Sequence, residues 1–229
     1  MDKHVFGLLR IGPVVAALVG CTAPKMAVPA GVAKTSEVLE VSDRSSWSGS
    51  LADESFKLGR YAVNDVDRDW DSSSGFSVGP FGSEKATAGF KYRLEGGGPA
   101  LEGTCASETK EKSWDVSATS EISWSKTTVA CSCAGGVDAA TLTWSEKVSE
   151  LTVSGTTYEL EPIYTTDDGG SVSDPVGFSA RAGGYLGAVE VSRPGRVWLD
   201  KGLDAATKAK ASCLFAGLLL YQPPSTTDD

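Results

Sequence analysis

Most of the chain consists of short segments in which apolar and polar residues alternate. Between Ser120 and Ser125 the apolar residues Ile122 and Trp124 are separated by polar ones. A period of two is typical of a β-strand with one buried face. The same alternation recurs at Leu151 and Val153, Tyr158 and Leu160, and Val189 and Val191. The sequence therefore predicts a mainly β fold, an antiparallel sandwich or barrel of roughly ten strands.

Turn-forming residues separate these segments. Ser154-Gly155 fits a two-residue hairpin loop, and Pro194-Gly195 suits the centre of a type II turn. The glycines at 96–98 and the stretch 167–170 are predicted to be loops. Together with the alternation, these signals predict one β-rich domain over residues 46–222 and a short disordered tail over 223–229.

One segment near the C-terminus favours a helix instead. Asp204 is a good N-cap residue, the residues that follow favour helix, and Pro223-Pro224 would end it. From Ala211 to Tyr221 the segment carries no charge on any face. A helix that is apolar all round is buried, and this one is too short for the roughly 20 residues that a membrane span needs. We expect it to pack in or against the β-sheet.

A β-barrel that holds an apolar C-terminal helix resembles the tubby C-terminal and phospholipid-scramblase group. The resemblance covers roughly residues 50–221 and rests on strand number and on the terminal helix. It implies binding of a lipid or another ligand without catalysis.

The cysteines predict export and two disulfide bonds. Besides Cys21, the chain contains Cys105, Cys131, Cys133 and Cys213, and an even number in an exported chain is typical of disulfides. A four-cysteine zinc site is the alternative, although such sites generally use Cys-x-x-Cys pairs. On a strand, Cys131 and Cys133 would lie on one face about 6.6 Å apart, which disfavours a bond between them. We expect one of them to pair with Cys105 and the other with Cys213.

The N-terminal residues have the features of an export signal. Lys3 and Arg10 precede an uncharged apolar run from Ile11 to Gly20, which is about half the length of a membrane-spanning helix. Leu18-Val19-Gly20-Cys21 resembles the bacterial lipobox, in which the cysteine receives a diacylglyceryl thioether and the preceding peptide is removed. The resemblance implies that residues 1–20 are a lipoprotein signal peptide and that acylated Cys21 binds the chain to a lipid bilayer.

Residues 21–45 are predicted to be the lipidated N-terminus and a flexible tether. Residues 22–35 are rich in Ala and Pro without a clear period, and could extend roughly 45 Å from the membrane. Thr22 stands where an aspartate would favour the inner membrane under the enteric sorting rule. We therefore expect a lipid-anchored protein of the cell envelope, at the outer membrane or cell surface.

The charge balance disfavours nucleic acid as a partner. The formal net charge is −9, and removal of Asp2, Lys3 and Arg10 with the leader makes it one unit more negative. No basic cluster is visible along the chain, whereas nucleic acids and anionic headgroups attract clustered Lys and Arg. The protein or small-molecule ligand of the domain cannot be identified from the sequence.

Several familiar catalytic patterns are incomplete. The only histidine, His4, lies in the leader, so the mature chain lacks the base of a Ser-His-Asp triad. This argues against a nucleophile elbow at 75–79, which fits Gly-x-Ser-x-Gly. Matches to Ser-x-x-Lys at 107–110 and 123–126 lack the companion motifs of penicillin-recognising enzymes. The carboxylates within 65–71 fail the EF-hand pattern, with Trp70 and Phe76 at its glycine and glutamate positions.

Two classes of function remain. The first is a non-enzymatic envelope lipoprotein with a binding or structural β domain and no metal or cofactor. The alternative is a glycosidase-like hydrolase that uses two carboxylates, which needs no histidine. The carboxylates considered for this role are Glu121, Glu159, Glu161 and Glu190.

Overall fold

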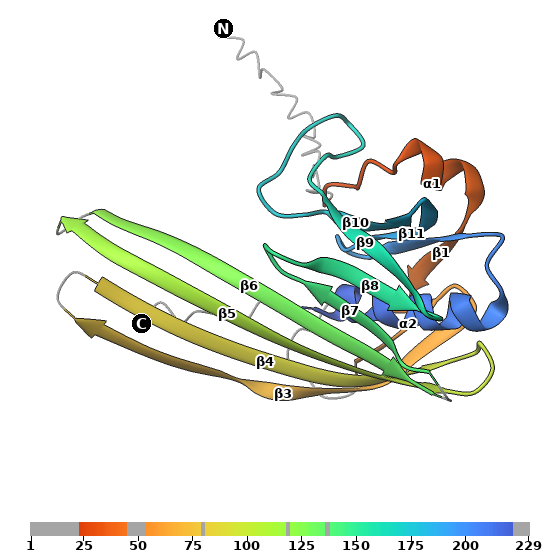
Figure 1. The fold of residues 1–229 in the computed structure, drawn as a ribbon, viewed down its shortest axis with the longest axis horizontal. Helices are drawn as coiled ribbons and strands as arrows, with labels where there is room; N and C mark the ends of the chain where they lie inside the picture. The colour runs from red at the N-terminus through yellow and green to blue at the C-terminus, as the bar shows by residue number, and fades with distance from the viewer. Residues whose placement is uncertain (1–22, 45–53, 79–80, 118–119, 136–137, 222–229) are drawn as a thin grey trace, which may run out of the picture.

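The computed structural model describes residues 23–44, 54–78, 81–117, 120–135 and 138–221. Twelve antiparallel strands in these ranges form one sheet, and pairing of the last strand with the first closes it into a barrel (Figure 1). The strands are β1 (Ser36–Ser42), β2 (Glu54–Leu58), β3 (Tyr61–Val78), β4 (Phe81–Glu95), β5 (Leu101–Ser117), β6 (Ser120–Ala134), β7 (Ala140–Trp144), β8 (Ser149–Val153), β9 (Thr156–Ile163), β10 (Gly177–Ala182), β11 (Gly184–Glu190) and β12 (Arg196–Asp200). The predicted mainly β fold is confirmed, as a barrel.

The β8–β9 hairpin shows how the alternation produces this fold. Leu151 and Val153 are buried, and Ser154 and Gly155 connect the strands with φ values of 50° and 76°. Two consecutive residues with positive φ are the requirement of a type I′ hairpin, whose twist matches that of the strands. The predicted hairpin is confirmed, and the loops at 96–98 and 167–170 also lie between strands.

The strands β3 to β6 are much longer than the others. They contain 18, 15, 17 and 15 residues, and their far ends project beyond the barrel as a four-stranded sheet (Figure 1). The near ends form the wall that packs on the C-terminal helix, α2 (Ala205–Leu220).

Helix α2 lies inside the barrel. It contacts β5, β6 and β7 on one side and β11 and β12 on the other, and each residue from Ala211 to Leu220 is buried. Asp204 caps its first turn by accepting hydrogen bonds from the amides of Ala206 and Thr207, both 2.9 Å long. The predictions of an N-cap at Asp204 and of a helix packed in the sheet are confirmed.

A cluster of charged residues closes the C-terminal end of α2. The Arg44 guanidinium donates to the carbonyl of Leu219 at 2.7 Å, and Arg68 donates to that of Leu220 at 3.1 Å. Buried Glu54 pairs with both arginines. Cations at this end satisfy carbonyls that lack partners in the helix and favour the helix dipole.

A joint of small residues and cysteines attaches α2 to the long strands. The Tyr92 hydroxyl donates to the Cys213 carbonyl at 2.7 Å, and burial raises the pKa of this phenol. A Cβ on Gly103 of the next strand would lie 2.1 Å from the Tyr92 ring, so only glycine leaves room for it. At Gly217, one turn after Cys213, a Cβ would lie 2.8 Å from the Cys105 sulfur. Gly103 thus makes room for the Tyr92 ring, and Gly217 allows close approach of helix and wall.

The prediction of a tether over 21–45 is wrong for residues 23–44. Met26 is 1% exposed, α1 (Ala30–Thr35) packs on the barrel, and β1 closes the sheet. The domain therefore begins before residue 46. The reason is that isolated apolar residues, Met26 and Val32, fill a small core on the outer barrel wall. The leader, Cys21 and the tail over 223–229 lie outside the described residues.

Candidate functional site

Three charged residues form one row across the outer face of the barrel where it closes. Glu40 on β1 is the register partner of Arg196 on β12, and Arg196 is the partner of Glu190 on β11. Cross-strand neighbours share a face of the sheet, so the arginine lies between two carboxylates. Glu190 and Arg196 lie on consecutive strands, whereas Glu40 is far away in the sequence and joins the row only through the pairing of β1 with β12.

Glu190 is the fixed centre of the site. The residue is only 4% exposed, and a carboxylate removed from water is tolerated only when it is paired and hydrogen-bonded. It accepts hydrogen bonds from Arg196 Nε at 2.7 Å, Arg196 Nη2 at 3.2 Å and the Met26 amide at 2.7 Å. These three bonds satisfy the buried charge and join the N-terminal segment to the barrel.

The N-terminal segment is held by backbone bonds as well. Met26 forms a β-bridge with Thr166, the Ala27 amide donates to Thr165, and the Asp167 amide donates to Lys25. Beneath this segment, Met26 and Val32 pack with Val176, Ala188 and Trp198 in a second small core outside the barrel. These bonds hold the segment against the barrel from Lys25 to Ala27.

Arg196 is held in a single orientation. Its guanidinium lies over the Trp198 ring, 5.0 Å from the centroid, while it pairs with Glu190. The hydrogen bond to Glu190 raises the pKa of Arg196 above its ordinary value, and Glu190, Glu40 and Asp167 add electrostatic contributions of the same sign. Its cation is therefore positioned before any ligand arrives.

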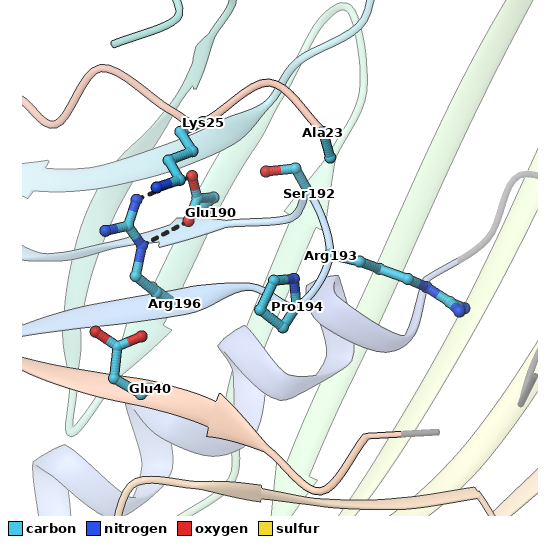
Figure 2. Close-up of a pocket in the computed structure, with 8 residues that line it drawn as sticks. All are labelled: Ala23, Lys25, Glu40, Glu190, Ser192, Arg193, Pro194 and Arg196. Carbon is cyan, nitrogen blue, oxygen red and sulfur yellow. Dashed lines mark hydrogen bonds and ion pairs between the residues drawn. The ribbon is translucent and has the colours of Figure 1, made fainter. Parts of the chain in front are cut away.

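A cavity of about 450 Å³ lies against this row (Figure 2). That volume is in the range of ligand pockets, roughly 300–1,000 Å³. Lys25 lies beside the Glu190–Arg196 pair, Glu40 lies on the other side of Arg196, and the Arg193 side chain points away from them (Figure 2). The lining residues are Ala23, Lys25, Glu40, Glu190, Ser192, Arg193, Pro194 and Arg196.

The cavity has unpaired groups of both signs at its mouth. Lys25 and Glu40 are exposed, and neither forms an ion pair with another residue that the structure describes. Arg196, in contrast, is engaged by Glu190. The arrangement suits a ligand with separate negative and positive groups.

The cysteines pair as the sequence predicts. Cys105 bonds to Cys131 across β5 and β6, with Cα atoms 4.1 Å apart, and Cys133 bonds to Cys213 on α2. Both disulfides are buried, at the joint between helix and wall. The zinc alternative does not apply, because all four sulfurs are used in disulfides.

The carboxylates considered for hydrolysis are distributed over three strands, β6, β9 and β11. Glu190 is bound by Arg196 and the Met26 amide, and Glu161 on β9 pairs with Arg181 at 2.7 Å. Glu159 is also on β9, next to Glu150 of β8 in register. Glu121 is on β6, and its side chain lies outside the described part of the structure.

The incomplete catalytic and calcium-binding patterns lie in strands. Residues 75–78 of the elbow pattern belong to β3, and the two Ser-x-x-Lys matches belong to β5 and β6. Asp65 and Asp67 are exposed on β3, next to a break in its register. Among the described residues, no three His, Cys, Asp or Glu side chains gather where they could hold a metal ion.

Strand pairing also creates a basic row that the linear sequence does not reveal. Lys85, Lys110 and Lys126 are register partners on β4, β5 and β6. Glu108 pairs with the first two, and Glu146 pairs with Lys126. The absence of a basic cluster therefore holds along the chain but not across the sheet, where carboxylates offset the lysines.

Sequence reasoning missed the site at Glu190. It considered Glu190 only as a hydrolase residue and did not single out Lys25, Glu40 or Arg196. The alternation of Leu39, Glu40 and Val41 does contain a strand signal. The row itself depends on the closing register of β1 and β12, which has no local signal.

Comparison with known proteins does not assign the chain to a family. No family model, no curated protein and no solved structure matches it. In the described ranges, neither helix has the length and apolar character needed to cross a membrane.

Proposed function

We propose that this chain is a lipoprotein of the cell envelope, acylated on Cys21, whose barrel has a non-enzymatic binding or structural role at the membrane surface. The observation that carries the proposal is the course of the N-terminal segment. Ala23, Pro24 and Lys25 are exposed, so the residues that follow the lipobox lie on the surface, where a lipidated terminus could reach a bilayer.

The fixed N-terminal segment implies a short connection to the membrane. Ala23 follows Cys21 by two residues, which span at most about 7 Å. The barrel would then lie against the headgroup layer, instead of at the end of a long tether. The face around Lys25 and Arg196 would be the part nearest the bilayer.

The site supports binding better than catalysis. Both carboxylate oxygens of Glu190 already accept hydrogen bonds from Arg196 and the Met26 amide, so the group is engaged in holding the structure and is not free to act on a substrate. Apolar side chains of α2 and of the barrel wall fill the interior in the described residues. The resemblance to tubby-like barrels, which implies lipid or ligand binding, points in the same direction and stays a prediction.

Metabolic labelling with a fatty acid tests the anchor. We expect the wild-type chain to carry the label and to fractionate with membranes, at the outer membrane or cell surface more than the inner membrane. Cys21→Ser should abolish the label, and Thr22→Ser, a neighbouring change that keeps the cysteine, should retain it. Undiminished labelling of Cys21→Ser would refute the proposal.

A further inference from the structure

We propose that the cavity beside Lys25 binds the headgroup of a bilayer phospholipid that carries both a phosphate and an ammonium group. The inference rests on the proposed acylation of Cys21 for its choice of a bilayer lipid. The site itself rests on the charges and geometry of described residues.

The position of the cavity matches the depth of lipid headgroups. Ala23 forms part of its wall and lies within about 7 Å of Cys21 along the chain. Acyl chains on Cys21 would enter the hydrocarbon core, whose boundary lies roughly 5–8 Å beneath the outer limit of the headgroups. The cavity would therefore open into the headgroup layer of the same leaflet.

The charges of the cavity match a zwitterion. Exposed Lys25 offers its ammonium to a phosphate, and exposed Glu40, beside Arg196, offers its carboxylate to an ammonium group. Arg196 separates Glu40 from Glu190 in the row and neutralises the buried carboxylate. A purely anionic headgroup would leave Glu40 without a hydrogen-bond partner. An ammonium group would donate a charge-assisted hydrogen bond to Glu40, and such bonds are the stronger class, so the site should distinguish the two headgroups.

The walls of the cavity are fixed in advance. Glu190 holds Arg196 on one side and the Met26 amide on the other, and Arg196 lies over Trp198. A site whose groups are already ordered loses less conformational entropy on binding. Lys25 and Glu40, at the mouth, are the groups left to close on the ligand.

Calorimetric titration of the full lipidated protein in non-ionic detergent micelles tests the site. The probes are glycerophosphoethanolamine and glycerophosphoglycerol, two phosphodiesters of which only the first carries an ammonium group. We expect the first to bind saturably and about ten-fold or more tightly than the second, since one charge-assisted contact differs. No saturable binding, or equal affinity for the two probes, would overturn the proposal.

Two single variants assign the roles. Lys25→Ala should weaken both probes about ten-fold or more, whereas Glu40→Ala should remove the preference for the ammonium probe. Both residues are exposed, so the barrel should stay folded, which circular dichroism checks. Lys34→Ala, an exposed lysine of α1 outside the cavity, is the matched control and should bind as wild type. Unchanged affinity in both cavity variants would exclude the assigned residues.

A lipid-retention experiment identifies the source of the ligand. The lipidated protein is reconstituted in vesicles of equal parts phosphatidylethanolamine and phosphatidylglycerol, extracted, and weighed by native mass spectrometry. We expect one phosphatidylethanolamine on the wild type and none on Lys25→Ala. Binding of the soluble probe without retained lipid would make a soluble zwitterion the ligand and overturn the lipid assignment. If fatty-acid labelling fails, the acylation of Cys21 and the bilayer as source of the ligand are both refuted. If the label is present but the calorimetric titration shows no binding, only the proposed headgroup site is refuted.

Discussion

The disulfide between Cys133 and Cys213 should contribute more to the stability of the fold than the disulfide between Cys105 and Cys131. It joins residues 80 apart in the sequence, whereas Cys105 and Cys131 are 26 apart. In the chain-entropy model the longer loop removes more freedom from the unfolded chain, about 4.5 kcal/mol against about 3.5 kcal/mol. The Cys133–Cys213 bond also attaches α2 to the wall, so removal of this bond releases the helix that fills the core from its covalent link.

Two double variants measure this difference. Cys133→Ala/Cys213→Ala and Cys105→Ala/Cys131→Ala remove one bond each and replace buried sulfurs by the same group. Because both sites are buried, the cavity contributions should be similar, and the first variant should lose about 1 kcal/mol more free energy of unfolding.

Urea denaturation followed by tryptophan fluorescence is the assay. It should be run on the oxidised wild type and on both variants, with free thiols counted to show that the remaining bond is intact. Equal losses, or a larger loss for Cys105→Ala/Cys131→Ala, would refute the argument from loop length. A typical domain is stable by about 5–15 kcal/mol, so either loss is measurable.

Three further changes probe other parts of the barrel. Glu54→Gln should lower the free energy of unfolding by about 3 kcal/mol in urea, since it breaks a buried pair; a loss below about 1 kcal/mol would contradict this. Gly217→Ala should lower the thermal midpoint of unfolding, because the added Cβ meets a disulfide sulfur. The overpacking should cost about 1–3 kcal/mol, which outweighs the gain from the higher helix propensity of alanine. An unchanged midpoint would contradict this. Hydrogen bonds from Lys110 and, to a smaller extent, Lys85 lower the pKa of Glu108 to about 2. The stabilisation from ionised Glu108 is therefore fully present above its ordinary pKa of about 4.3 and is lost as the pH falls through the lowered pKa. An NMR titration should show this midpoint and an upward shift in Lys110→Ala, and a midpoint near 4.3 in the wild type would contradict it.

Local patterns predicted the strands and the helix well where the burial of a residue follows from the residues next to it in the sequence. Alternation at Leu151 and Val153 identified a strand, and the charge-free stretch after Ala211 identified a buried helix. The cysteine pairing followed from strand geometry, because Cys131 and Cys133 share a face and cannot easily bond to each other.

The candidate site depended on contacts that no local pattern records. The ion pair of Glu190 and Arg196 follows from the short connection between β11 and β12. The burial of Glu190, however, depends on Met26, 164 residues away. The Ala- and Pro-rich composition around Met26 is that of a linker. The segment is ordered because Met26 packs on apolar side chains of the outer face of β11 and β12. The closing pairs of β1 and β12 are of the same long-range kind.

The position of α2 after all twelve strands has a consequence for biosynthesis. A nascent chain acquires its barrel wall before it acquires the helix that fills the barrel, so a product that stops short of Ala205 has strands but no core. Its inward-facing leucines and valines would stay open to water, a state that proteases and chaperones bind. Protection of the barrel interior would therefore depend on translation past Leu220, where α2 ends.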